Sequence, residues 1–409
     1  MREFMKNGVK YTIIVLIILL MGVLIFFGGK ALSKAREEKR IKNATVIVEL
    51  VQDRKVGFAS KKRVSDFIEN INGNIVDDFL VDTTSLGEKT IEFEYINDEG
   101  IKIPQTFNIQ VEDTTPPIVW LGSSYSITTK FDSTLEEKIM CADDHDDEPS
   151  CKVEGEYDTK KAGSYKVKFV AEDSSGNRTE IPFTLNVTNP TSGGGSGYVP
   201  SKYKFEDAKA DLGNEGVKFG IDVSSWQGDL DFEKLKNAGV EFAFVRVGSK
   251  KGLGGEFFLD SKFDRNMTGF NEVGIPVGSY FYSYARNEDE AREEAEWVVQ
   301  YLKKYKVDLP VAFDFEDWSR YNRYKMSLYK LNRNAEVFIE TLNKHGYEGM
   351  LYGSLNYLNK LWDTEGKTVW VAHYTKNADY QGKFKFWQFS AAGKIDGVPG
   401  DVDMDIMYE

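Results

Sequence analysis

Histidine and cysteine are scarce in this sequence. The three histidines, His145, His345 and His373, stand far apart, which argues against a zinc site or the H-E-x-x-H pattern of a metalloprotease. The two cysteines, Cys141 and Cys151, are too few for a disulfide-rich scaffold or a four-cysteine metal site. A basic excess is also lacking, since 52 lysines and arginines face 65 aspartates and glutamates. Because phosphate neutralisation supplies most of the affinity for nucleic acids, we expect no nucleic-acid partner.

The chain is long enough for several domains and apolar enough to give each of them a core. Its 409 residues exceed one ordinary domain of roughly 150 residues and suggest two to four. Hydrophobic residues make up 41% of the chain and charged residues 29%, a composition that excludes a largely disordered protein.

One uncharged apolar run stands near the N-terminus. Residues 11–29 contain no charged side chain and, as a helix, would extend about 28 Å, close to the roughly 30 Å hydrocarbon core of a bilayer. The run is longer than the roughly 7–15-residue apolar region of a signal peptide. It predicts a transmembrane anchor between a short cytoplasmic tail, 1–10, and a basic juxtamembrane segment, 30–43. Secretion after signal cleavage is the alternative.

Residues 44–188 contain an internal repeat with an offset of 76 residues. Gly87 and Phe93 of the first copy, for example, recur as Gly163 and Phe169. In both copies apolar residues alternate with polar ones, which is the period of a half-buried antiparallel strand. We therefore expect two copies of one small all-β domain.

The junction between the copies, DTTPP at 113–117, resembles the junction of bacterial immunoglobulin-like domains. The resemblance implies two sandwiches, 44–113 and 114–188, that act as surface spacers or weak wall-binding modules. The acidic loop 143–148 offers oxygen ligands that suit Ca²⁺, but a solvated charged loop is the favoured interpretation. A disulfide between the two cysteines that flank this loop is predicted for an oxidising exterior, with two free thiols as the alternative. Gly/Ser-rich composition then predicts a flexible linker over 189–215.

Residues 216–409 alternate short apolar runs with amphipathic stretches, a pattern typical of β/α units. Eight strands are expected, with helices after the first five only, which predicts an irregular barrel smaller than the roughly 250-residue (β/α)₈ norm. The expected strands are 218–223, 241–247, 276–284, 310–316, 349–353, 368–374, 384–389 and 402–407. The expected helices lie around 231–238, 260–273, 287–305, 325–344 and 355–362.

The segment PVAFDFEDW at 310–318 carries the strongest chemical signal. Alternate side chains of a strand share a face, so Asp314 and Glu316 would both face the barrel interior near the carboxyl end of the strand, where barrel active sites lie. Two carboxylates about 5 Å apart repel by about 3 kcal/mol at an effective dielectric of about 20, so one is expected to keep its proton near neutral pH. A protonated acid beside a carboxylate is what glycoside hydrolysis uses. Taken alone, the pattern also fits a solvated strand end.

Four further segments accompany this pair. They read GIDVSSWQG at 220–228, WVAHY at 370–374, FWQF at 386–389 and GDVDMD at 400–405. In this order the segments resemble the motifs of glycoside hydrolase family 25, the lysozyme-like N-acetylmuramidases, over nearly all of 216–409. The resemblance implies a (β/α)₅(β)₃ barrel that needs no metal or organic cofactor. The whole chain is thus expected to be multidomain, with an N-terminal helix, two sandwiches and an α/β barrel.

The resemblance also assigns roles to residues of these motifs. Glu316 would be the general acid/base, and Asp314 would stabilise the developing positive charge or position the substrate N-acetyl group. Asp222 and Asp403 would complete the acidic cluster. Residues expected to contact the substrate are Tyr282, Tyr374, Trp387, Gln388 and Trp226. For the three ring residues Tyr282, Tyr374 and Trp387, barrel packing is the alternative. The chain departs from the family at Asp405, where relatives often have asparagine.

The implied reaction is hydrolysis of the β-1,4 bond between N-acetylmuramic acid and N-acetylglucosamine in peptidoglycan. A hydrolase of a chitin-like glycan and a non-catalytic wall-binding scaffold are the alternatives. Because peptidoglycan lies outside the membrane, the C-terminal domain is expected to be extracytoplasmic, although three basic residues before the apolar run and six after it favour the opposite orientation. The expected partners are peptidoglycan glycan strands and the bacterial membrane.

Overall fold

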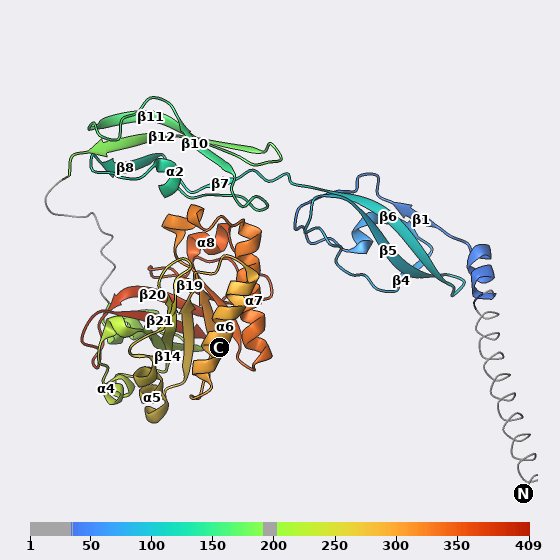
Figure 1. The fold of residues 1–409 in the computed structure, drawn as a ribbon. Helices are drawn as coiled ribbons and strands as arrows, with labels where there is room; N and C mark the ends of the chain where they lie inside the picture. The colour runs from blue at the N-terminus through green and yellow to red at the C-terminus, as the bar shows by residue number, and fades with distance from the viewer. Residues whose placement is uncertain (1–33, 35, 191–202) are drawn as a thin grey trace, which may run out of the picture. The chain divides into compact units, whose positions relative to one another are not determined.

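A computed structural model describes residues 34, 36–190 and 203–409. The predicted membrane span at 11–29 lies outside these residues, and none of the helices within them is long and apolar enough to cross a membrane. By its internal contacts the chain divides into two compact units, with the boundary after Thr114. Figure 1 shows the chain as a ribbon and labels many of its helices and strands.

The first unit is built on a long β-hairpin. Its strands β5 (Gly87–Asn97) and β6 (Lys102–Glu112) pair antiparallel over almost their whole length. Ile91, Phe93 and Tyr95 are buried, while the glutamates between them face solvent, so the predicted period of two is confirmed. The sheet order is β2-β6-β5-β4, with β1 and β3 paired separately. The other elements are β1 (Val48–Leu50), β2 (Lys55–Gly57), η1 (Val64–Phe67), β3 (Ile68–Ile71) and β4 (Gly73–Ile75).

The second copy repeats this arrangement 76 residues later. Its long strands are β11 (Gly163–Glu172) and β12 (Arg178–Thr188), and the sheet order β10-β11-β12-β8 matches β4-β5-β6-β2 strand for strand. The internal repeat is therefore confirmed, whereas membership of the immunoglobulin-like class stays a prediction. The predicted disulfide joins Cys141 and Cys151, with an S–S distance of 2.06 Å. The other elements are β7 (Ile118–Val119), β8 (Ser124–Thr128), α2 (Leu135–Lys138), β9 (Cys141–Ala142) and β10 (Ser150–Glu154).

The C-terminal part of the chain is a closed eight-stranded barrel. The order is β13-β21-β20-β19-β18-β17-β16-β14, and β14 pairs with β13 to close it, while β15 extends β14 as a hairpin. The strands are β13 (Val217–Val223), β14 (Phe242–Lys250), β15 (Phe257–Leu259), β16 (Val277–Tyr282), β17 (Val311–Asp314), β18 (Gly349–Ser354), β19 (Thr368–Ala372), β20 (Phe386–Gly393) and β21 (Val402–Tyr408). The helical segments are η2 (Ser225–Gln227), α4 (Phe232–Asn237), α5 (Phe263–Val273), α6 (Glu288–Leu302), η3 (Trp318–Arg323), α7 (Leu328–Lys344) and α8 (Leu355–Lys360).

The distribution of helices around the barrel agrees with the sequence. Helical segments follow the first five barrel strands, and within 203–409, which the structure describes throughout, no helix separates the last three. The long helices begin at residues that favour helix starts. Asn287 caps α6 by accepting the Glu290 N–H at 2.9 Å, and Ser327 caps α7 by accepting the Lys330 N–H at 3.3 Å.

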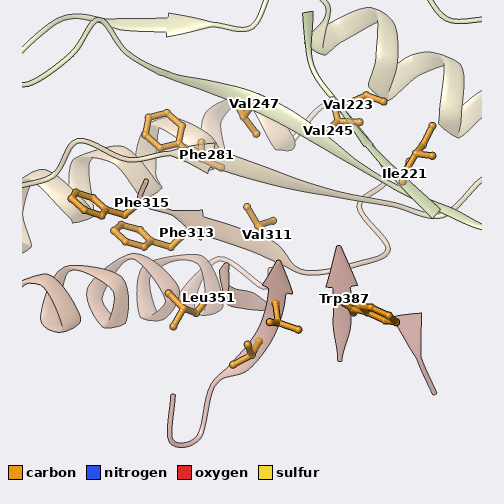
Figure 2. Packing of buried hydrophobic residues seen from close by; sticks show 14 of the residues in the cluster. Ile221, Val223, Val245, Val247, Phe281, Val311, Phe313, Phe315, Leu351 and Trp387 are labelled. Atoms are coloured by element: carbon orange, nitrogen blue, oxygen red, sulfur yellow. The ribbon is translucent and has the colours of Figure 1, made fainter. Parts of the chain in front are cut away.

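Alternate residues of the barrel strands build two apolar layers. Outward-facing side chains such as Val245 and Phe313 pack between the strands and the helices, as Figure 2 shows. Inward-facing side chains, among them Phe242, Phe244 and Phe386, fill the barrel interior and are fully buried. A small barrel of eight strands is closed by such side chains rather than open as a pore, so any cavity must lie at one end.

The predicted linker at 189–215 is partly wrong. Residues 205–212 form α3 (Phe205–Leu212), and Phe205 and Ala208 are buried against the barrel. The Phe205 N–H donates to the Lys394 carbonyl at 2.9 Å. Apolar residues three and four positions apart give this short helix one apolar face, which the polar composition of the stretch concealed.

The second all-β domain and the barrel share one compact unit, although the sequence indicated two separate domains. The Asn322 side chain on η3 donates to the carbonyls of Glu136 and Ile139 at 2.7 and 2.9 Å. Its Oδ1 accepts the Cys141 N–H at 3.0 Å. These partners lie more than 180 residues apart in the sequence, so no local pattern predicts the contact.

The acidic loop 143–148 belongs to the same contact and is not the solvated loop expected. Asp143 is buried, and its Oδ1 accepts the Asp146 N–H at 2.7 Å. Asp147 accepts the backbone N–H of Ser327, at the start of α7, at 3.0 Å. A carboxylate at a helix start is stabilised there by the unpaired N–H groups and the helix dipole.

Candidate active site

The four acids that the sequence singled out come together at one end of the barrel. Asp222 lies near the end of β13, Asp314 ends β17, Glu316 follows two residues later, and Asp403 lies in β21. All four line a cavity of about 160 Å³. Its lining consists of Asp222, Tyr280, Asp314, Glu316, Tyr352, Trp370, Tyr374, Gln388 and Asp403.

Strand alternation explains why the pair on β17 faces this cavity. Val311, Phe313 and Phe315 are fully buried in the outer apolar layer, where Figure 2 shows them. Asp314 and Glu316 therefore face the opposite side, as predicted. The cavity lies at the carboxyl ends of the parallel strands, where barrel enzymes carry their active sites.

Negative charge is concentrated in the cavity without a compensating cation. Among the described residues that line it, none is a lysine or an arginine. Burial raises the pKa of the Asp314 carboxyl well above its usual range, and the charges of Glu316 and Asp222 raise it further, while Arg246 opposes them. The pKa of Asp403 is raised in the same way, by burial and by the charge of Asp222. Several of these carboxyls cannot all be ionised at once, so at least one holds a proton near neutral pH.

Glu316 occupies the mouth of the cavity. Its side chain remains exposed to solvent, in contrast to Asp314, which is 3% exposed. The protein groups that crowd Glu316 nevertheless raise the pKa of its carboxyl, and burial is the cause. Glu316 thus combines access to a substrate with a tendency to keep its proton.

Gln388 connects the acids to the tyrosines of the cavity. Its Nε2 donates to Asp222 Oδ2 at 2.7 Å. Its Oε1 accepts the hydroxyls of Tyr352 and Tyr374, each at 2.9 Å. A carboxylate oxygen can only accept, so Asp222 Oδ2 fixes the amide with its amine toward Asp222 and its Oε1 toward the two hydroxyls, which can donate. The prediction that Gln388 belongs to the site is supported by this position.

The other predicted substrate contacts are placed differently. Tyr374 lines the cavity. Tyr282 is half-buried next to it; burial raises the pKa of its hydroxyl, and the charges of Asp314 and Glu316 add to the effect. Trp226 lies on η2, outside the cavity lining, and is 84% exposed.

Trp387 does not belong to the cavity. It is 3% exposed in the outer apolar layer shown in Figure 2, and its Nε1 donates to the His373 carbonyl at 2.8 Å. Adjacent residues of a strand face opposite sides, so Trp387 and Gln388 cannot both point into the barrel. The prediction of a sugar contact from Trp387 is therefore corrected to a packing role.

Sequence reasoning missed three residues that line the cavity and one that lies beneath it. The lining residues are Tyr280, Tyr352 and Trp370. Tyr352 shares the inward parity of Met350 on β18, so strict alternation along that strand would have found it. Asp405 is fully buried and accepts the Trp370 Nε1–H at 2.9 Å.

A barrel with clustered acids at the carboxyl ends of its strands, at least one of them protonated, defines the site of a glycoside hydrolase. The sequence profile of glycosyl hydrolases family 25 matches residues 221–398. The uncharacterized protein YegX of Escherichia coli K12 is 30% identical over 197 residues, which cover 46% of this chain and 68% of YegX. The chain belongs to glycosyl hydrolases family 25 and is a glycoside hydrolase of the lysozyme type.

Two lysozymes are also similar to part of this chain. The autolytic lysozyme of Clostridium acetobutylicum is 26% identical over 193 residues, which cover 46% of this chain and 56% of that protein. Lysozyme M1 of Streptomyces globisporus is 28% identical over 205 residues, which cover 45% of this chain and 65% of that protein. In each case the similar region is less than half of this chain.

Proposed function

We propose that the chain hydrolyses peptidoglycan at the β-1,4 bond between N-acetylmuramic acid and N-acetylglucosamine, with Glu316 as general acid/base. The observation that carries the proposal is the position of Glu316 at the mouth of a cavity that also holds Asp222, Asp314 and Asp403. The similarity to two lysozymes supports the choice of substrate. A glycan strand is a long polymer, and an open cavity at the end of a barrel suits it.

In this reaction Glu316 protonates the oxygen of the leaving sugar while positive charge develops at C1 of the muramic acid. Burial raises the pKa values of both Asp314 and Glu316, so the pair holds a proton near neutral pH, and the reactive form is the one in which Glu316 carries it and Asp314 is ionised. In that form the negative charge of Asp314 stabilises the oxocarbenium-like transition state or orients the substrate N-acetyl group. Glu316 then takes a proton from the attacking water. Asp222 and Asp403 lie on the side of the barrel opposite β17, and the charge of Glu316 raises the pKa values of both carboxyls, so protonation of Glu316 is coupled to theirs.

The Glu316→Gln variant tests the assignment. Gln keeps the shape of the side chain but cannot supply a proton, so turnover of purified peptidoglycan is expected to fall by about a hundredfold or more, with wall binding retained. The control is Glu272→Gln, which changes an exposed glutamate on α5 and should leave turnover unchanged. Undiminished wall clearing by Glu316→Gln would refute the proposed role.

Mass analysis of the fragments separates the proposed substrate from its alternatives. Muramic acid at the new reducing ends is expected from the wild-type chain. Cleavage of chitin oligomers with N-acetylglucosamine ends alone would favour the chitin-like alternative. Binding of the wall with no fragments released would favour the non-catalytic scaffold.

The proposed location is the outer face of a bacterial membrane, with residues 11–29 as a single-pass anchor. The disulfide between Cys141 and Cys151 supports an oxidising compartment for the chain beyond the anchor. Protease added to intact cells freed of wall is expected to degrade the C-terminal domain. Full protection would reverse the orientation, and release of most of the protein into the medium would favour signal cleavage.

A further inference from the structure

Asp405 is a buried acid that lies beneath the cavity and does not line it. Asp405 follows Asp403 by two residues on β21, so both face the barrel interior, while Met404 and Ile406 between and after them pack outside. Asp405 is 0% exposed, and the next inward residue, Met407, belongs to the apolar layer that fills the barrel. The Asp405 carboxyl therefore stands between an apolar plug and the acids of the site.

The hydrogen bonds of Asp405 leave one of its oxygens without a donor. Oδ1 accepts the Trp370 Nε1–H at 2.9 Å. Oδ2 is buried and has no N–H or O–H donor among the described residues. The neighbouring group is instead the carboxyl of Asp222, which lies within hydrogen-bonding contact of Asp405. Two carboxylate oxygens in such contact repel unless a proton lies between them.

We propose that Asp222 and Asp405 share one proton across this contact, so that the pair carries a single negative charge and Asp405 acts as a positioning residue for Asp222. The proton satisfies the buried oxygen of Asp405 and converts a repulsive contact into a strong hydrogen bond. Gln388 Nε2 donates to the other side of the pair, at Asp222 Oδ2. Asp222 is thereby held from two sides, by an amide above and a carboxyl below.

The surroundings of the pair favour retention of this proton. Burial raises the pKa of both carboxyls well above the usual range. The charge of Asp405 raises the pKa of Asp222 further, and the charge of Asp403 raises that of Asp405. The titratable or charged groups that face the pair from the neighbouring elements are Asp403, Asp314, Glu316, Tyr280, Tyr352, Tyr374 and Arg246. Arg246 is the cation among them, and its guanidinium is bound to Asp260 at 2.6 Å.

The shared proton lowers the negative charge of the proposed active site, and this part of the inference rests on the proposed function. If both carboxyls were ionised, the site would carry one more negative charge close to Glu316. With one proton shared, the pair contributes only the charge that Asp222 presents to the cavity.

Infrared difference spectroscopy of the full chain tests the shared proton without reference to activity. At pH 7 the difference spectrum between the wild type and Asp405→Asn is expected to show the carbonyl band of one buried protonated carboxyl, shifted in D₂O, while the bands of other protonated carboxyls cancel. Asp401→Asn, which removes an exposed acid just before the same strand, is the matched control and should keep the band. Identical spectra for the wild type and Asp405→Asn would overturn the proposal.

Activity and stability distinguish a positioning role from simple packing. Asp405→Asn keeps both hydrogen bonds, so its kcat on peptidoglycan is expected to stay within about threefold of wild type. Asp405→Leu removes both, and kcat is expected to fall by about tenfold or more. Equal losses in the two variants would contradict positioning through the hydrogen bond. If the wild type itself releases no muramic acid ends, the proposed function fails, whereas the infrared result still decides whether the proton is shared.

The pH dependence of unfolding is a third test of the shared proton. The folded pair holds a proton that the unfolded chain releases, so its contribution to stability is present at low pH and is lost as pH rises through the raised pKa of the pair. The thermal midpoint of Asp405→Asn is therefore expected to decline less than that of the wild type between neutral and alkaline pH. An equal decline in both proteins would argue against the shared proton.

Discussion

Gln388 shows how much of the site depends on the orientation of one amide. The hydroxyls of Tyr352 and Tyr374 both point at Oε1, and this leaves only the amine for Asp222. No single segment of sequence contains this arrangement, because the three partners of Gln388 come from β13, β18 and the end of β19. The sequence nonetheless identified Gln388, through the W-Q pair of the family resemblance.

The Gln388→Glu variant is expected to disable the site without unfolding the barrel. Glutamate has nearly the same shape but lacks the amine that donates to Asp222, and it adds a fifth acid to the cavity. Loss of a hydrogen bond to a charged group is worth about 1.5–3 kcal/mol, so kcat/KM on peptidoglycan should fall by about tenfold to a hundredfold. Gln381→Glu, at an exposed position, is the control. Equal activity of the two variants would show that the Gln388 amine has no role in turnover.

Trp387→Phe is expected to change stability rather than substrate affinity. The indole is buried in the outer apolar layer, and its Nε1–H bond to the His373 carbonyl would be lost. The cost in free energy of unfolding should be about 1–3 kcal/mol, from the smaller ring and the unpaired carbonyl. Thermal unfolding measures the loss, while KM for peptidoglycan should stay at the wild-type value. A large rise in KM with unchanged stability would restore the sugar contact that the sequence predicted.

At the scale of elements, strand periodicity predicted most of what the structure shows. The alternation of Val311, Phe313 and Phe315 with Asp314 and Glu316 was enough to place both acids inside the barrel. The same rule, applied to every strand, would have placed Trp387 outside. What periodicity could not supply was contact between distant segments. The helix α3 looks polar until the barrel covers its apolar side, and the acidic loop looks solvated until α7 is placed beside it.

The helix α6 carries a buried acid that should make folding depend on pH. Glu294 is fully buried, accepts the Ser283 hydroxyl at 2.5 Å and the Tyr284 N–H at 3.2 Å, and lies 3.8 Å from the Lys250 ammonium. Burial raises the pKa of Glu294 from 4.5 to about 7 despite these partners. The folded chain therefore keeps a proton that the unfolded chain has already lost, so this contribution to stability is complete below about pH 4.5 and is lost as pH rises to about 7.

Glu294→Gln is expected to remove this part of the pH dependence. A shift from 4.5 to about 7 corresponds to about 3 kcal/mol, and the amide can still accept from Tyr284 and donate to Ser283. Chemical denaturation between pH 4.5 and pH 7 should therefore show a smaller loss of unfolding free energy in Glu294→Gln than in wild type. Glu293→Gln, the exposed neighbour on α6, should behave as wild type. If the unfolding free energy of Glu294→Gln depends on pH as steeply as that of the wild type, Glu294 is already ionised at pH 4.5.

At the scale of the whole molecule, the second all-β domain is more than a spacer before the barrel. It contacts η3, the segment that begins two residues after Glu316. The ring centroids of Trp120, in this domain, and Tyr357 are 4.6 Å apart. Tyr357 in turn stacks on Trp318, the first residue of η3, with their ring centroids 4.2 Å apart. The disulfide at Cys141 and the three hydrogen bonds of Asn322 lie in the same contact. The domain therefore supports the chain directly after the proposed general acid.

Asn322→Ala is expected to uncouple the unfolding of the second all-β domain from that of the barrel. The change removes three hydrogen bonds and leaves the Cys141 N–H and two carbonyls without a partner, at a cost of about 2–4 kcal/mol in the free energy of unfolding. The unit is expected to unfold thermally in one transition in the wild type and in two transitions in Asn322→Ala. Hydrogen exchange of the Cys141 amide is expected to be faster in the variant. Asn356→Ala, at an exposed position on α8, should change neither. Because η3 begins two residues after Glu316, we expect kcat on peptidoglycan to fall in Asn322→Ala while wall binding persists. If kcat is unchanged although the variant unfolds in two transitions, the contact stabilises the unit but does not support the active site.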